Sequence, residues 1–252
     1  MIEMQNLSFG YSGGDPLLAD MTLSLQPGSF HFLTGPSGAG KTTFLRLCYA
    51  ELLPTSGRMT AFGQDVTGLT RDGIAGLRRR VGVVHQDTQF LDHLPVAENL
   101  ALPLMVSGAA IDMAALGDLL AWVQLSNHAR AMPPELSGGE RQRAWLSMMV
   151  AQQAGTLLLD EPISALDIAH AVEVLSLVRR MCQTQGLTAV IVLHEVNMAA
   201  RFCDHIVALK GGRLALQGTP ADLMRADALQ AIYGLPMEVL TRADGQLITV
   251  PA

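Results

Sequence analysis

Cysteine and positive charge are scarce in this chain of 252 residues. Its three cysteines, Cys48, Cys182 and Cys203, have neither the spacing of metal ligands nor a paired framework, so we expect reduced, buried thiols. Lysine and arginine together number 17 against 23 acidic residues, and the resulting net charge of -6 argues against a nucleic-acid partner. The one dense basic run, at residues 78–80, is expected to be the solvated end of a helix.

Long hydrophobic runs are absent as well. The longest ones, such as residues 100–106, are far shorter than the ~20 residues that a transmembrane helix needs. The first residues have neither the basic segment nor the apolar core of a signal peptide. We therefore expect a soluble, cytoplasmic protein that reaches a membrane only through a partner. Apolar residues make up 49% of the chain, which predicts either a large core or an apolar surface kept for a partner.

Four short apolar runs without alternation predict buried strands of a parallel sheet, because such strands are covered by helices on both faces. They lie at residues 30–33, 81–84, 156–159 and 189–193. Apolar positions at helical spacing predict helices between and after them. The predicted helices cover residues 41–52, 112–125 with Asp112 as cap, 140–153 and 168–185.

The two ends of the chain have a different pattern. Residues 1–30 alternate apolar and polar side chains, which predicts antiparallel strands. Residues 206–217 predict a hairpin that turns at Gly211 and Gly212, and a short helix over 220–234 follows it. With no internal repeat and no linker, the sequence predicts one α/β domain over residues 1–252. A helical lobe is inserted at about 88–140, and the C-terminal hairpin and helix lie within about 206–252.

The first buried run leads into GPSGAGKT at residues 35–42, which matches G-x-x-x-x-G-K-[ST] between a strand and a helix. Gly35, Gly38 and Gly40 would let backbone N–H groups curl around phosphate oxygens at the helix N-terminus. Lys41 would supply a cation to the outer phosphates, and the hydroxyl of Thr42 suits Mg2+. The remaining nucleotide contacts expected from this segment are Pro36, Ser37, Ala39 and Thr43. A glycine-rich turn with an incidental lysine is the weaker alternative.

Polar residues follow the other three buried runs: Gln86, then Asp160 and Glu161, then His194. Each one alone could be an ordinary polar residue at the end of a strand. Together they would lie at the sheet edge where ligands of parallel α/β sheets bind, beside the phosphate loop. This set of an amide, two acids and an imidazole suits cleavage of a γ-phosphate.

Each of these side chains then has an expected role. Asp160 would hold the Mg2+ shell together with Thr42, and Glu161 would accept a proton from the attacking water. Gln86 would bridge the metal ion and the water. His194 would donate to the γ-phosphate or to the water as charge develops.

The segment LSGGE at residues 136–140 predicts a helix start with too many glycines. Ser137 is a good N-cap, and Glu140 can complete a capping box with it. Gly138 and Gly139 then each cost the first turn roughly 1 kcal/mol relative to alanine. We therefore expect another group to come close to these two glycines.

The order of these motifs resembles the ATP-binding cassette ATPases. GPSGAGKT looks like their Walker A loop, LSGGE like their signature and LLLDEP like their Walker B motif. Gln86 matches their Q-loop residue, SALD at residues 164–167 their D-loop, and His194 their switch histidine. Tyr11 falls where the family stacks an aromatic ring on adenine; without the resemblance it would be a plain turn tyrosine. The resemblance covers nearly the whole chain.

The resemblance implies a P-loop NTPase core of the RecA-like type, with an N-terminal antiparallel β subdomain and an inserted α-helical subdomain. It implies ATP and Mg2+, and a head-to-tail homodimer with two ATP molecules between the subunits. In that dimer Ser137, Gly138, Gly139 and Glu140 would form the signature side of the neighbour's site. Two departures from the family pattern, Ile163 and Glu195, remove no group that is expected to act on ATP.

Two subfamilies are suggested by different halves of the chain. Residues 1 to about 140 resemble the bacterial cell-division ATPase that pairs with a small permease-like membrane protein. Residues from about 141 to 252 resemble ATPases of iron-chelate importers, the ferric-hydroxamate kind above all. Either a natural mosaic or a constructed hybrid would have this pattern. We expect an iron-siderophore importer subunit at the cytoplasmic face of the inner membrane, with the cell-division ATPase as the alternative.

In either case a transmembrane permease would be the partner, with its coupling helix docked near residues 86–108. Other classes fit less well. Cassette ATPases of DNA repair carry a long coiled coil before the signature, and those of translation usually have two cassettes in one chain. P-loop kinases and GTPases do not require an LSGGE segment. A purely regulatory binder is disfavoured by Glu161.

Overall fold

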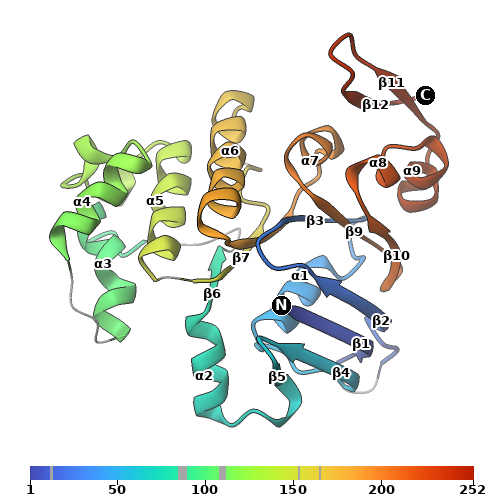
Figure 1. Cartoon of the computed structure of the whole chain (residues 1–252), viewed down its shortest axis with the longest axis horizontal. Helices are drawn as coiled ribbons and strands as arrows, with labels where there is room; N and C mark the ends of the chain where they lie inside the picture. The colour runs from blue at the N-terminus through green and yellow to red at the C-terminus, as the bar shows by residue number, and fades with distance from the viewer. Residues whose placement is uncertain (12–13, 85–89, 108–111, 153, 165) are drawn as a thin grey trace.

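The computed structural model describes residues 1–11, 14–84, 90–107, 112–152, 154–164 and 166–252. A six-stranded sheet occupies the middle of the molecule, with a four-stranded sheet beside it (Figure 1). A group of helices lies at one end, and a separate two-stranded hairpin lies near the C-terminus at the other. Within the described ranges no helix combines the length and apolar character that a membrane crossing needs.

The six-stranded sheet has the order β10-β9-β3-β8-β7-β6. All four predicted buried runs are in it, and they pair in parallel as predicted. A fifth parallel strand, β9, pairs with β3 on the other side. The strands are β3 (Phe30–Thr34), β6 (Val81–Val84), β7 (Thr156–Asp160), β8 (Thr188–Val192), β9 (His205–Lys210) and the antiparallel edge strand β10 (Arg213–Gly218).

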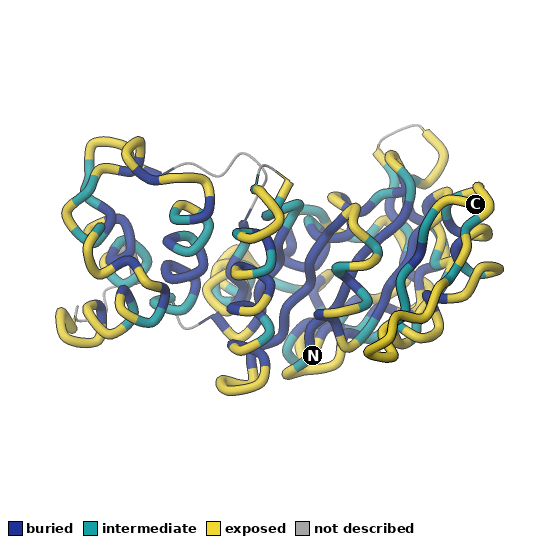
Figure 2. The backbone as a smooth tube through the Cα atoms, turned by 90° about the horizontal axis from the view of Figure 1, so that it is seen from above, coloured by how far each residue is buried: buried dark blue, intermediate teal, exposed yellow. Residues whose placement is uncertain are grey.

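Both faces of this sheet are buried, which explains why its strands read as unbroken apolar runs. Neighbouring residues point to opposite faces: Phe32 belongs to one apolar core and Leu33 to the other. Helix α6 (Ile168–Gln185) packs into the first core and α1 (Lys41–Cys48) into the second. The buried backbone runs through the middle of the molecule, with exposed segments around it (Figure 2). Phosphate-loop and strand-end residues therefore project from a rigid support.

The N-terminal sheet has the order β2-β1-β4-β5 and is antiparallel throughout. It consists of β1 (Ile2–Phe9), β2 (Leu18–Leu25), β4 (Ser56–Ala61) and β5 (Gln64–Asp65). The prediction of antiparallel strands at the start is confirmed, whereas β4 and β5 were not predicted. A short 3-10 turn over Val66–Gly68 leads to α2 (Arg71–Arg79).

The basic run at residues 78–80 ends α2, as expected, but it is not simply solvated. The Arg78 guanidinium donates to the carbonyl oxygens of Tyr49 and Ala50, at 3.2 and 2.9 Å. The Arg80 guanidinium lies 4.0 Å from the centre of the Phe62 ring. These exposed arginines therefore tie the helix end to the segment after α1 and to the N-terminal sheet.

The helical group contains α3 (Val96–Ser107), α4 (Met113–Trp122) and α5 (Gly138–Ala151), with 3-10 turns at Ser126–His128 and Pro133–Glu135. Asp112 caps α4 as predicted, since its carboxylate accepts from the N–H groups of Ala114 and Ala115. Helix α5 lies beside α3 and α4, on the far side of β6 and β7 from α1 (Figure 1).

The C-terminal part continues from α7 (Val196–Phe202) through the β9–β10 hairpin, which turns at Gly211 and Gly212 as predicted. The single helix predicted over 220–234 is wrong. It is two helices, α8 (Pro220–Leu223) and α9 (Ala226–Tyr233), because the backbone leaves the helical region at Met224 and is extended at Arg225. The hairpin of β11 (Met237–Thr241) and β12 (Leu247–Pro251) follows.

The three cysteines are free and buried, as the sequence predicts. Burial raises the pKa of all three thiols, which disfavours the reactive thiolate. They act as small apolar side chains in the two cores.

Candidate functional site

The phosphate loop joins β3 to α1, and its glycines are required by the backbone. Gly35, Gly38 and Gly40 have φ angles of 140°, 76° and 96°, which favour glycine. A Cβ atom on Gly35 would lie 2.1 Å from the carbonyl oxygen of Leu209. Because Gly40 is the N-cap of α1 and has no side chain to cap it, the first N–H groups of the helix are left for an anion.

Lys41 is held at the same loop. Its ammonium donates to the carbonyl oxygens of Gly35 and Pro36, at 2.8 and 3.0 Å, and the residue is only 8% exposed. Burial lowers the pKa of this ammonium, and the nearby carboxylates of Glu161 and Asp160 act in the opposite direction. The structure therefore brings the predicted cation and the two predicted acids into one electrostatic neighbourhood.

The other predicted residues of the loop differ in exposure. Thr42 and Ser37 are exposed, so their hydroxyls are accessible to a ligand. Ala39 and Thr43 are buried, so Ala39 can offer only its backbone. The exposed hydroxyl of Thr42 and the carboxylate of Asp160 are oxygen donors of the kind that Mg2+ prefers. No group of three or more His, Cys, Asp or Glu side chains suited to a metal ion occurs in the part of the chain that the structure describes.

Glu161 and His194 meet directly, although 33 residues separate them. Glu161 follows β7, His194 follows the neighbouring strand β8, and the Nε2 of His194 lies 2.7 Å from the Oε1 of Glu161. The side chain of His194 is 60% exposed and that of Glu161 is 23% exposed. The pair opens on a cavity of about 720 Å³ that Ser164 and Asn197 also line.

The backbone at Glu161 is strained. Its φ of 51° is in the left-handed region, which costs a residue with a Cβ roughly 1–3 kcal/mol. The carbonyl of Glu161 accepts from both the N–H and the hydroxyl of Ser164, at 3.3 and 3.0 Å, which holds the turn in place. Strain of this kind at a polar strand end is typical of a functional position.

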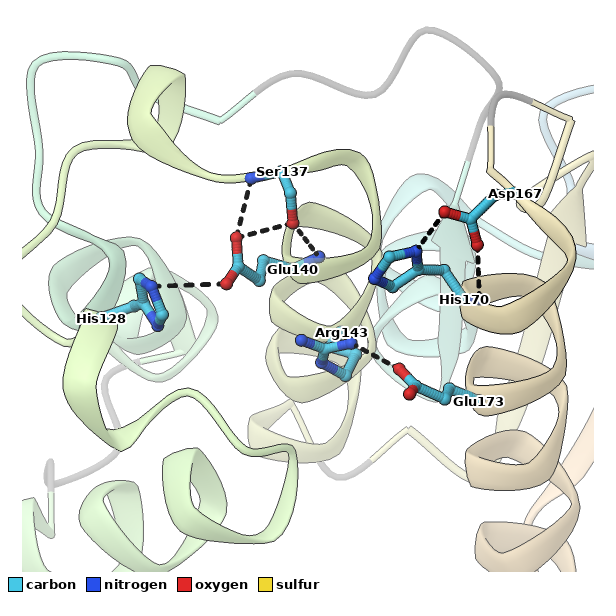
Figure 3. Close-up of polar contacts among 7 residues, drawn as sticks. All are labelled: His128, Ser137, Glu140, Arg143, Asp167, His170 and Glu173. Atoms are coloured by element: carbon cyan, nitrogen blue, oxygen red, sulfur yellow. Dashed lines mark hydrogen bonds and ion pairs between the residues drawn. The ribbon is translucent and has the colours of Figure 1, made fainter.

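Ser137 and Glu140 form the predicted capping box at the start of α5 (Figure 3). The Glu140 carboxylate accepts from the N–H of Ser137 at 2.8 Å and from its hydroxyl at 2.6 Å. Both bonds favour the ionised form and lower the pKa of Glu140. The second carboxylate oxygen lies 3.3 Å from the Nε2 of His128, a contact that sequence reasoning missed. Glu140 is therefore anchored on both sides.

The two glycines of this segment differ. A Cβ atom on Gly139 would lie 2.7 Å from the Cδ2 of His170, so α6 needs a glycine here for its own packing. His170 is held by Asp167, the N-cap of α6, through its N–H at 2.9 Å and its Nδ1 at 2.8 Å (Figure 3). A contact within the chain thus accounts for Gly139, and the expectation of an outside group now rests on Gly138.

Tyr11 lies where an aromatic platform would be useful. It is 57% exposed, and its ring meets Phe9 edge-on at 5.1 Å between ring centres. Tyr11 and Gly38 line one cavity of about 420 Å³, together with the Gly211–Gly212 turn. This cavity has room for a flat base between the Tyr11 ring and the phosphate loop. No sequence motif indicated that the Gly211–Gly212 turn would line it.

The structure thus gathers the phosphate loop, Asp160, Glu161 and His194 at one end of the central sheet. Gln86 lies outside the described residues. The signature segment is not part of this group, because α5 belongs to the helical group beyond β6 and β7 (Figure 1). The predicted site residues of one chain therefore lie in two separate groups.

Comparisons with known proteins match this chain to one family. A model of the ABC transporter family matches residues 18–164. The methionine import ATP-binding protein MetN 2 of Pseudomonas aeruginosa is 39% identical over 212 residues, covering 82% of this chain and 63% of that protein. The phosphonates import ATP-binding protein PhnC of Thiobacillus denitrificans is 33% identical and covers 92% of both chains.

Solved structures have the same fold. A dimeric post-hydrolysis state of the ATP-binding cassette MJ0796, bound to ADP and Pi, superposes with a TM-score of 0.78 at 27% identity. It covers 87% of this chain and 99% of that one. The predicted P-loop NTPase fold with a mixed α/β architecture is confirmed. The chain spans about 63% of the length of the Pseudomonas methionine relative.

The two subfamily predictions are wrong. The two relatives just described are methionine and phosphonate import proteins, not a cell-division ATPase or an iron-chelate importer. The methionine import protein of Ralstonia nicotianae is 34% identical over 98% of the chain, so one kind of relative crosses the supposed junction near residue 140.

Proposed function

Because the chain belongs to the ABC transporter family, we propose that it is the ATP-hydrolysing subunit of an importer. The observation that carries this proposal is the contact of His194 with Glu161 beside the buried Lys41. It combines a carboxylate that can accept a proton with a cation that can neutralise phosphate charge. These are the two demands of γ-phosphate cleavage by water.

In the proposed reaction the N–H groups of the loop and the Lys41 ammonium bind the phosphates. Thr42 and Asp160 would hold Mg2+, which supplies charge neutralisation at the phosphate oxygens. Glu161 takes the proton of the attacking water. The N–H at Nε2 of His194 would donate a hydrogen bond to the Glu161 carboxylate, which holds that group in its orientation.

We further propose that two copies form a head-to-tail homodimer. The separation of the signature segment from the phosphate loop supports it, since each half-site needs a complement. The backbone N–H groups of Gly138 and Gly139, in the first turn of α5, would then approach the γ-phosphate bound by the other copy. The similar cassette MJ0796 is dimeric in its ADP- and Pi-bound structure, which supports the proposal of a dimer.

The whole chain, residues 1–252, would act as one ATP-binding unit with an inserted helical lobe. Its place would be the cytoplasmic face of the membrane, bound to a transmembrane permease near residues 86–108. Methionine is the first solute to test, because relatives at 38–39% identity from several bacteria are methionine import proteins. Phosphonates are the second, supported by a relative matched over 92% of its length.

The test has two stages. Purified protein is assayed for phosphate release from ATP with and without Mg2+; release that needs Mg2+ supports the proposal, and no release under either condition contradicts it. Vesicles that contain the chain with the permease encoded beside it are then assayed for uptake of labelled methionine and labelled phosphonate. Uptake of neither solute with ATP inside would contradict both solute assignments.

A further inference from the structure

The C-terminal helix α9 reaches the phosphate loop through one side-chain hydrogen bond. The hydroxyls of Tyr233 and Thr34 lie 2.6 Å apart, although 199 residues separate them in the sequence. Thr34 is the last residue of β3 and is 1% exposed. The next residue, Gly35, is the first of the phosphate loop. Tyr233 is therefore bonded to the side chain of the residue that immediately precedes the loop.

Neighbouring contacts join α9 and the loop to the same strand. Thr34 pairs with Ala208 of β9, and the carbonyl oxygen of Leu209 blocks any side chain at Gly35. The ammonium of Lys210, the last residue of β9, donates to the carbonyl oxygen of Ala231 in α9. The start of the loop, the end of β9 and α9 thus form one packed unit, in which the Tyr233 bond ties α9 directly to β3.

Tyr233 is suited to hold a fixed position. Its ring is half-buried, and α9 ends directly after it at Gly234, whose φ of 79° closes the helix. Burial raises the pKa of the tyrosine hydroxyl, so this group stays protonated at neutral pH and the bond keeps a donor. A tyrosine has two side-chain torsions, so little conformational entropy is lost in fixing it.

We propose that Tyr233 is a positioning residue for the phosphate loop, acting through Thr34. This inference rests on the proposed binding and hydrolysis of ATP. Phosphate affinity depends on N–H groups that already point at the ligand, because a loop that must order on binding spends part of the binding energy on that ordering. Loss of the Tyr233 bond would therefore weaken ATP binding more than it slows the chemical step.

The test is a double-mutant cycle on the full-length protein. Tyr233→Phe and Thr34→Val each remove one hydroxyl, and the double variant removes both. We measure the Kd for ATP, kcat and thermal stability of each. Each single variant is expected to raise the Kd about three- to tenfold with kcat within about twofold, and the double variant to match the single ones.

Two matched controls separate positioning from stability. Thr34→Ser keeps the hydroxyl and should restore the wild-type Kd. Tyr49→Phe removes a tyrosine hydroxyl that donates to Glu51 at the other end of α1, and should leave the Kd unchanged. If Tyr233→Phe does not fold, Thr34→Val carries the same expectation.

Two results would overturn the inference: a lowered melting temperature with an unchanged Kd, or additive effects in the double variant. Failure of the proposed function would look different. Wild-type protein that binds ATP without hydrolysing it would refute hydrolysis, while the Kd series would still report on Tyr233.

Discussion

Glu161 and His194 are the residues on which the proposed reaction depends most. Their contact of 2.7 Å joins the ends of two neighbouring strands. The left-handed backbone at Glu161 means that the chain leaves the extended strand conformation at this residue. Removing the negative charge while keeping the size of the side chain isolates the proton-accepting role from packing.

We therefore expect Glu161→Gln to lower the rate of ATP hydrolysis by about 10²- to 10⁴-fold, because an amide cannot take the proton of the water. ATP binding should persist, since Lys41 and the loop are untouched. Phosphate release and ATP affinity measured side by side check this. Glu238→Gln, at an exposed position of β11, is the control with unchanged hydrolysis. Near-normal hydrolysis by Glu161→Gln would remove this residue from the role.

The sequence predicted residues of this kind when they lie in a contiguous motif. GPSGAGKT, Asp160, Glu161 and His194 follow buried strands, and strand order brings them together. The bond between Tyr233 and Thr34 had no such signal, because neither residue belongs to a motif and the pairing depends on how α9 packs. The contact of His128 with Glu140 was missed for the same reason.

At the level of elements, the start of α5 is bound to its surroundings from two sides. The capping box closes its first turn, while Gly139 lets the His170 ring of α6 approach. The spacing between these two helices is thus set by a position without a side chain. The signature segment keeps its orientation because α6 and Glu140 both hold it.

Gly139→Ala should test this packing. A new Cβ atom would lie 2.7 Å from His170, so we expect a loss of about 1–3 kcal/mol in the free energy of unfolding. Gly117→Ala in α4 meets no atom within 4 Å and should instead stabilise by about 0.5–1 kcal/mol, because alanine is the better helix former. Chemical denaturation measures both. Equal effects of the two substitutions would refute the packing explanation, and adding His170→Ala should recover most of the loss.

Periodicity predicted the elements well where one period dominates. The four buried strands, the β9–β10 hairpin and α6 have the predicted positions. The break between α8 and α9 was missed because residues 220–234 keep a helical pattern of apolar residues across it. Likewise α1 ends at Cys48, before the predicted residue 52, because Ala50 adopts a φ of 55°.

At the scale of the whole molecule, a buried histidine couples stability to pH. His31 of β3 is 1% exposed, stacks on His205 of β9 at 5.1 Å, and lies 3.1 Å from both the Ser29 hydroxyl and the carbonyl of Gln26. Burial lowers its pKa from 6.5 to about 4. The unfolded chain therefore takes up this proton first as the pH falls.

The stability that neutral His31 contributes is complete above pH 6.5 and is lost as the pH falls toward 4. Between pH 7 and pH 5 we expect this group alone to cost about 2 kcal/mol of unfolding free energy. Urea denaturation at both pH values measures it. The difference should shrink by that amount in His31→Gln and persist in His93→Gln, at an exposed position. An unchanged pH dependence in His31→Gln would contradict the assignment.

The central claim is that two chains complete each other's ATP site, and mixing two inactive variants tests it most directly. Lys41→Ala removes the phosphate cation. Gly138→Asp places a carboxylate at the first position of α5, where the helix tolerates it but a γ-phosphate would be repelled. In mixed dimers one of the two sites has neither defect. The account predicts that the equimolar mixture recovers roughly a quarter of wild-type hydrolysis, from random pairing in a twofold dimer. A mixture as inactive as each variant alone would contradict it.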